Sequence, residues 1–417
     1  MKTNHTPWTF ILVAIIASGL PAPATLAATP DRARPPAFGA AYIPSAESEV
    51  LQEVPSSSDP IVREMSGLRK QLDATPADYA VADRLAREYI DYGRQVGDAH
   101  YAGYAEAVIA PWIAKSPPPV PVLVLQATIL QFRHQFSEAR VLLRTALARD
   151  RDNAQAWLTL ATLDMVQGEY PIAAQDCAEV NRVGGNVLGI ACSGNLRSYI
   201  GQARQSIALL NQVADDAPSL PKPFKAWIQG LLAESCERLG SWDEAELHYR
   251  KALAYTPGDN YLLVGYADFL LDRGRASEVP PLLEQSAQSD TAFLRIALAE
   301  AELKSPATTR DTWIMAARFE ALAQRGSDYF GREQVRFALH LQNDPTLALE
   351  LATRNWQVQR APWDVRVLLE AALGANQPGA AVPVLQFVEE TKLQDPVIDS
   401  LARQLRSQLK SGPAATS

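Results

Sequence analysis

The chain has 417 residues, of which 47% are hydrophobic and 21% charged, so it can bury a sizeable core and is not expected to be disordered. Its formal net charge is −8, and it contains no run of Lys or Arg. Nucleic acid is therefore excluded as a leading partner, and no direct binding to anionic lipid is expected of the mature chain.

The first 27 residues have the features of a cleavable bacterial signal peptide. Lys2 precedes an apolar run from Trp8 to Leu20, and small residues at Thr25 and Ala27 suit signal peptidase. Cleavage after Ala27 removes one of the 39 basic residues and none of the 47 acidic ones, which changes the net charge from −8 to −9. We expect a periplasmic or secreted protein. The alternative is an uncleaved helix that anchors the chain in the inner membrane, although the run is shorter than the roughly 20 residues a spanning helix needs.

The rest of the chain predicts helices and no strands. Residues 28–59 are rich in Pro, Ala and Ser and predict a flexible leader. Beyond them, helix-length stretches with apolar residues three and four apart alternate with short breakers. We expect N-terminal helices over 60–119, regular helix pairs over 120–293, degenerate helical repeats with a C-terminal cap over 294–410, and a disordered tail over 411–417. The fold class is all-α.

Two segments share one spacing of large, small, Gly and aromatic residues. These are Leu232, Ala233, Gly240, Trp242 and Ala245 in the unit that starts at Ala226, and Leu160, Ala161, Gly168, Tyr170 and Ala173 in the unit that starts at Ala154. The small residues allow two helices to approach closely, and the Gly ends the first helix of each pair.

This pattern resembles the tetratricopeptide repeat family, whose unit has about 34 residues. The resemblance covers about residues 120–293 and is strongest in the two units above. It implies a right-handed α-solenoid of antiparallel helix pairs, in which each pair buries its apolar face against its neighbours.

The resemblance also implies a partner-binding groove on the inner face of the first helices. The residues it places there are Gln155, Thr162, Trp227, Glu234, Glu237, Tyr261 and Asp268. This set is mixed aromatic, polar and acidic without a cationic pair, which favours a protein or peptide segment with basic and apolar residues. The alternative is that these are ordinary solvent-facing residues of a curved scaffold.

No pattern in the sequence predicts catalysis. The mature chain has His100, His134, His248 and His340, which fall in different units without ligands at metal-binding spacing, and we expect His134 and His248 at exposed helix ends or surfaces. Phosphate loops, nucleophile elbows and dinucleotide fingerprints are missing from the sequence. We therefore expect a non-enzymatic protein without a cofactor or metal, and keep an enzyme with an unrecognised site as a remote alternative.

The chain has three cysteines, an odd number for an oxidising compartment. Cys177 and Cys192 flank a predicted turn around Gly185 at similar distances, so antiparallel packing would bring them to similar heights. They are a candidate disulfide, and the alternative is that each is a small buried apolar residue.

These observations favour a protein-interaction scaffold or adaptor in the bacterial cell envelope. A rival from another class is a membrane-anchored structural spacer without a groove ligand. The sequence does not distinguish between them, because a solenoid fold serves both purposes.

Overall fold

The computed structural model describes residues 59–215, 220–324 and 331–411. The predicted signal peptide, all of the predicted leader except Asp59, and the predicted tail beyond Ser411 lie outside these ranges. Within them, every regular element is a helix and no strand occurs. None of the helices in this part of the chain is both long enough and apolar enough to span a bilayer.

The N-terminal half forms three helices followed by four regular helix pairs. The first three are α1 (Pro60–Ala74), α2 (Tyr79–Val96) and α3 (His100–Ile113). The pairs are α4 (Val120–Phe132) with α5 (Phe136–Arg149), α6 (Ala154–Val166) with α7 (Tyr170–Gly184), α8 (Asn186–Tyr199) with α9 (Ala203–Asp215), and α10 (Lys222–Leu239) with α11 (Trp242–Tyr255).

The next pair is irregular. Its first helix is α12 (Asn260–Asp272), and its second is divided into η1 (Ala276–Glu278), α13 (Val279–Leu283) and η2 (Glu284–Ser286). Pro280 and Pro281 explain the break between η1 and α13, because proline has no backbone N–H to continue a helical hydrogen-bond ladder from the preceding turn.

Helices continue to the end of the described chain. They are α14 (Asp290–Glu302), α15 (Thr308–Gln324), α16 (Arg332–His340), α17 (Pro345–Trp356), α18 (Pro362–Gly374), η3 (Pro378–Ala381), α19 (Val382–Thr391) and α20 (Pro396–Ser411). The boundary expected at residue 293 falls inside α14, so we place it before Asp290. The repeat register was too weak there to locate the break.

Local signals fix the ends of the helices. The Asp78 carboxylate accepts hydrogen bonds from the backbone N–H groups of Ala80 and Val81 at the start of α2, and Asn153 caps α6 in the same way. Such caps satisfy backbone donors that have no partner within the helix. At the other end, Gly240 closes α10 with a φ of 73°, a left-handed conformation that favours glycine.

The small residues of the repeat pattern lie where helices meet. The side chains of Ala161, Ala173, Ala233 and Ala245 are 0% exposed. The first helices of successive pairs also pack on one another, from α4 through α6, α8 and α10, and again from α12 through α14, α16 and α18. We call the layer that these first helices form the inner side. The result is the all-helical, tetratricopeptide-like solenoid that the sequence predicts.

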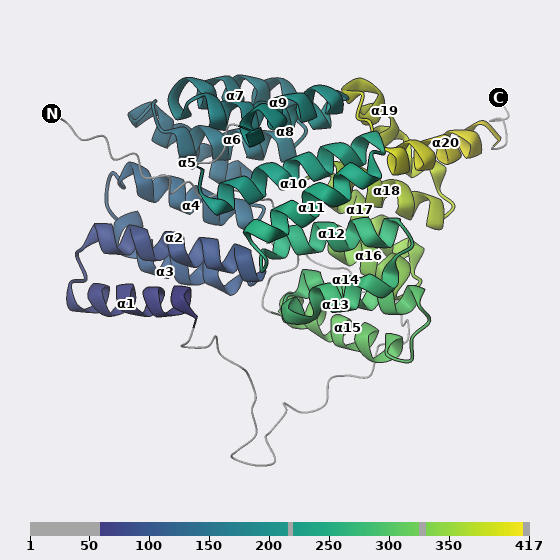
Figure 1. Cartoon of the computed structure of the whole chain (residues 1–417), viewed down its shortest axis with the longest axis horizontal. Coiled ribbons are helices and arrows are strands. Elements are labelled where there is room, and N and C mark those ends of the chain that lie inside the picture. The colour runs from purple at the N-terminus through teal and green to yellow at the C-terminus, as the bar shows by residue number, and fades with distance from the viewer. Residues whose placement is uncertain (1–58, 216–219, 325–330, 412–417) are drawn as a thin grey trace, which may run out of the picture.

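The row of helices bends until distant parts touch (Figure 1). Arg94 of α2 donates to Asp259 at the start of α12 over 2.8 Å. Farther along, the backbone N–H of Arg360 donates to the carbonyl of Val166 over 2.7 Å. The ring centroids of Phe387 in α19 and Tyr170 in α7 are 5.9 Å apart. The C-terminal helices therefore pack back onto the middle of the chain.

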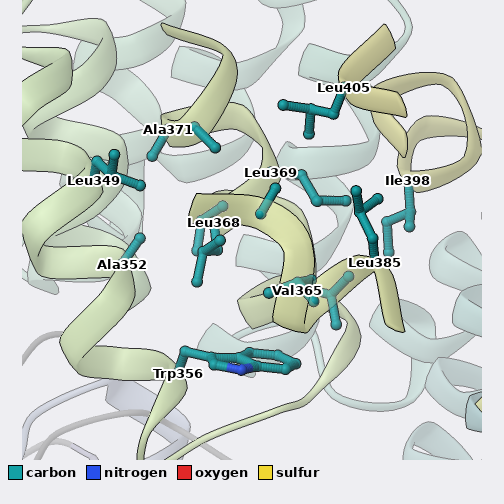
Figure 2. Close-up of a cluster of buried hydrophobic side chains, with 14 of the residues drawn as sticks. Leu349, Ala352, Trp356, Val365, Leu368, Leu369, Ala371, Leu385, Ile398 and Leu405 are labelled. Atoms are coloured by element: carbon teal, nitrogen blue, oxygen red, sulfur yellow. The ribbon is translucent and has the colours of Figure 1, made fainter. Parts of the chain in front are cut away.

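The C-terminal helices also have a hydrophobic core of their own. Val365, Leu368 and Leu369 of α18 lie at its centre, between Ala352 and neighbouring side chains of α17 on one side and those of α19 and α20 on the other (Figure 2). Because this core is built within α16–α20, the looser repeats of the C-terminal region form a stable block. That block can present side chains to the inner side of the N-terminal pairs.

Candidate partner-binding face

The predicted groove residues come from three first helices. Gln155 and Thr162 lie on α6, Trp227, Glu234 and Glu237 on α10, and Tyr261 and Asp268 on α12. In the structure, the predicted residues of α10 and α12 lie together, and the predicted residues of α6 lie apart from them.

On α6, both predicted residues are buried. Gln155 is 8% exposed and its side-chain amide donates to the Thr159 hydroxyl, while Thr162 is 6% exposed and its hydroxyl donates to the carbonyl of Leu158. These side chains therefore satisfy local hydrogen bonds inside the molecule and do not present a surface to a partner.

Trp227 is half-buried on α10. Its ring packs against that of Phe224 with the centroids 5.3 Å apart in an edge-to-face arrangement, and it borders the hydrophobic cluster of α6–α10. Most of this aromatic surface belongs to the core, and the exposed remainder is the apolar part of the predicted face.

Glu234 and Tyr261 join α10 to α12. The Tyr261 hydroxyl donates to a Glu234 carboxylate oxygen over 2.5 Å, and Arg238 reaches the other oxygen over 3.4 Å. Burial, together with the negative Glu234, raises the pKa of Tyr261 well above its ordinary value. The prediction placed these two side chains on one face, and the structure pairs them.

Glu237 departs from the expected acidic role. The Tyr249 hydroxyl donates to its carboxyl group over 2.5 Å. Burial raises the pKa of Glu237 to about 8, although the Tyr249 hydrogen bond opposes the shift. The group is therefore largely uncharged at neutral pH, so it cannot supply the negative charge that the sequence analysis assigned to it.

Asp268 also differs from the expectation of an open acidic residue. It is 5% exposed and accepts hydrogen bonds from Arg295 over 3.0 and 2.8 Å and from Arg336 over 2.7 Å. Burial raises the pKa of Asp268, but Arg295 and Arg336 outweigh this effect and hold it below its ordinary value. The carboxylate is charged, and its countercharges come from α14 and α16.

These cations were not expected from the sequence. The repeat spacing places only residues of α6, α10 and α12 on the inner side, whereas Arg295, Arg336 and Arg366 come from helices nearer the C-terminus. The repeat register is degenerate in that part of the chain. Spacing therefore gave no signal that these side chains would face α12.

The four described histidines lie on or beside different helices. Among the described residues, no group of His, Cys, Asp and Glu could hold a metal ion. His248 lies 2.7 Å from the Gln229 side chain. His134, which we expected to be exposed, is 7% exposed and packs its ring against Phe136. It takes a left-handed conformation with a φ of 56° after α4, which turns the ring under the next helix.

The predicted cysteine pair is bonded in the structure. Cys177 of α7 and Cys192 of α8 form a disulfide with their Cα atoms 5.5 Å apart, and both side chains are buried. The remaining Cys236 keeps a buried thiol, and burial raises its pKa to about 12. Cys236 is therefore a packing residue of α10, since only the thiolate is a strong nucleophile.

No protein-family model and no curated protein matches the sequence. Several solved structures resemble the fold. The human IFIT1 dimer with m7Gppp-AAAA is 12% identical with a TM-score of 0.45, and the match covers 83% of this chain and 86% of that one. Yeast Tom70 is 10% identical with a TM-score of 0.40, and the match covers 85% and 87%.

The APC/C hetero-tetramer Cut9–Hcn1 is 12% identical with a TM-score of 0.40. The match covers 83% of this chain and 52% of that one, so this chain spans about half its length. Structural similarities as low as these do not indicate what this chain binds or does.

Proposed function

We propose that the protein is a non-enzymatic interaction scaffold of the bacterial cell envelope that holds a protein or peptide segment on its inner side. The observation that carries the proposal is the junction of α10 and α12, where the half-buried Trp227 lies on the same helix as Glu234 and Glu234 pairs with Tyr261. An aromatic ring and a carboxylate on neighbouring helices suit a segment that offers apolar and basic side chains.

Two observations support a location outside the cytoplasm. The first is the signal-like sequence of residues 1–27. The second is the buried Cys177–Cys192 disulfide, because structural disulfides persist in oxidising compartments such as the periplasm. Isolation of the mature chain and determination of its N-terminal residue tests the location, and a start at Ala28 is the expected result.

One observation favours the rival function of a structural spacer. Asp268 already has internal partners, and Glu237 is largely uncharged, so the inner side is less open than the sequence implies. A spacer of this kind would keep residues 1–27 as a membrane anchor and would hold no ligand. An unprocessed N-terminus together with a lack of captured partners would support it.

Capture of partners from a cell-envelope extract tests the proposed function. We expect the native chain to retain a partner that the Trp227→Ala, Glu234→Lys variant loses, because the variant removes the aromatic surface and reverses the charge beside it. Leu247→Ala is the matched control, since Leu247 is 49% exposed on α11, the second helix of the same pair. Circular dichroism checks that each variant is folded. Equal capture by all three forms would contradict binding at this face.

A further inference from the structure

Two arginines and a tryptophan form a stack on the C-terminal block. The guanidinium carbon of Arg336 on α16 lies 4.8 Å from the ring centroid of Trp363 on α18, and that of Arg366 lies 4.4 Å from the same centroid. Both distances are within the range of cation–π attraction. We call these three residues the arginine–tryptophan stack.

The stack faces two carboxylates that lie one helical turn apart on α12. Arg336 donates to Asp268 over 2.7 Å, and Arg366 donates to both oxygens of Asp272 over 2.6 Å each. The paired residues are 68 and 94 positions apart in the sequence. These ion pairs therefore close the inner side between α12 and the C-terminal block, and they do not hold neighbouring residues together.

The ion pairs of this closure lie beside an apolar contact, because Leu271 of α12 packs against the cluster that contains Phe337 and Leu341. Arg366 and Asp272 keep 16% and 21% of their side chains exposed, whereas the hydrophobic residues around Leu368 and Leu369 are almost fully buried. An ion pair between two blocks that each have their own core adds little net stability, because desolvation offsets much of the attraction. A segment that displaces only the two arginine side chains can exchange these ion pairs for equivalent ones while the apolar contact stays in place.

We propose that the arginine–tryptophan stack is an internal ligand of the Asp268–Asp272 face of α12, and that an external segment with arginine and aromatic residues competes with it. This inference rests on the proposed scaffold function and specifies its regulation. The stack offers two cations and an aromatic ring to the two carboxylates of α12. A partner that competes for these carboxylates is expected to offer the same groups. Binding at Asp268 and Asp272 then requires the side chains of Arg336 and Arg366 to leave α12.

The closed state lowers the apparent affinity for a partner by the fraction of molecules that are open. If closure is favoured by about ten to one, release of the stack strengthens binding about tenfold without any change in the binding face. The Arg336→Gln, Arg366→Gln variant provides that release. It leaves Asp268 paired with Arg295, and it removes the Arg366 partner of both Asp272 and Glu370.

The probe is a short labelled peptide with an arginine on each side of a tryptophan, and its binding is followed by fluorescence anisotropy. We expect the Arg336→Gln, Arg366→Gln variant to bind it about tenfold more tightly than the native chain does, in proportion to the open fraction. Hydrogen exchange in α12 and α18 should also become faster. Arg354→Gln with Arg406→Gln is the matched control, because it removes two positive charges from exposed sites on α17 and α20.

A second variant separates opening from binding. Asp272→Asn with Arg366→Gln removes both members of the Asp272–Arg366 ion pair. It therefore leaves one unpaired carboxylate fewer than the first variant does, while Glu370 loses its Arg366 partner in both variants. It should speed hydrogen exchange without the gain in peptide affinity, because the receiving carboxylate is missing. Unchanged exchange in both folded variants, or equal peptide affinity in the native chain and the double-arginine variant, would overturn the internal-ligand proposal. Partner capture through Trp227 and Glu234 would be unaffected by either result.

Discussion

At the residue scale, buried carboxyl groups decide how stability depends on pH. Asp164 of α6 and Asp176 of α7 are 0% and 5% exposed, and Arg140 forms an ion pair with Asp164. Burial and the neighbouring Asp164 carboxyl raise the pKa of Asp176 to about 8, against the lowering effect of Arg140 and Arg144. At neutral pH, Asp176 is therefore largely protonated in the folded chain.

This pKa predicts a fall in stability as the pH rises. The folded chain binds a proton at Asp176 that the unfolded chain, with an ordinary aspartate pKa, has already lost. The free energy of unfolding should therefore decrease between about pH 4 and 8, and Glu237 contributes in the same direction. Asp176→Asn, measured by urea unfolding across this range, should reduce the decrease and stabilise the chain at pH 8. Asp73→Asn, at an exposed site on α1, is the control. If the free energy of unfolding changes equally with pH in the native chain and in both variants, Asp176 does not have this role.

The residue scale also shows which of the predicted groove residues lie together. Repeat positions on α10 and α12 correctly grouped Glu234 with Tyr261, because the register fixes which residues share a helix face. They could not reveal that Glu237 is largely uncharged or that Asp268 is already paired. Those properties depend on Tyr249 of the adjoining helix and on arginines far along the chain.

At the scale of elements, the alternation of apolar periods and breakers was enough to predict an all-helical chain, and the small residues Ala161 and Ala233 marked where helices meet. The pattern was less informative where prolines interrupt it. Pro280 and Pro281 divide the second helix of the α12 pair, and the boundary expected at residue 293 falls within α14. The apolar periodicity predicts which face of a helix is buried, but it does not predict which distant helices that face contacts.

Gly201, between α8 and α9, tests the packing of the C-terminal block on the middle of the chain. A Cβ atom at Gly201 would lie 2.1 Å from the carbonyl oxygen of Lys392, whereas one at Gly240 would have its nearest neighbour at 3.5 Å. Both glycines have a left-handed φ, of 70° and 73°. Gly240→Ala should therefore cost about 1–2 kcal/mol from backbone strain alone.

Gly201→Ala should lower the free energy of unfolding clearly more than Gly240→Ala does. It causes the same backbone strain, and its Cβ atom also clashes with the backbone of Lys392. Urea unfolding of the two variants beside the native chain gives the comparison. Hydrogen exchange should in addition show faster opening around Lys392 in the Gly201 variant only. Equal destabilisation by the two substitutions would mean that the C-terminal block does not rest on the turn before α9.

At the scale of the whole molecule, the structure describes a solenoid that bends back on itself. Arg94 with Asp259, Val166 with Arg360, and Asp272 with Arg366 each join helices that are far apart in the sequence. The regular repeats account for local stacking, while these contacts join distant parts of the solenoid. None of them follows from a nearest-neighbour pattern, which is why the sequence predicted the solenoid but not its closure.

The central claim is that the inner side at α10 and α12 holds a partner segment. Hydrogen exchange of the native mature chain, compared with and without the partner it captures, tests this claim most directly. The account predicts slower exchange upon binding in α10 and α12 around Trp227, Glu234 and Tyr261, and faster exchange in α18, where Arg366 leaves Asp272. Protection confined to the second helices of the pairs, such as α11, with no change in α10 and α12, would contradict it.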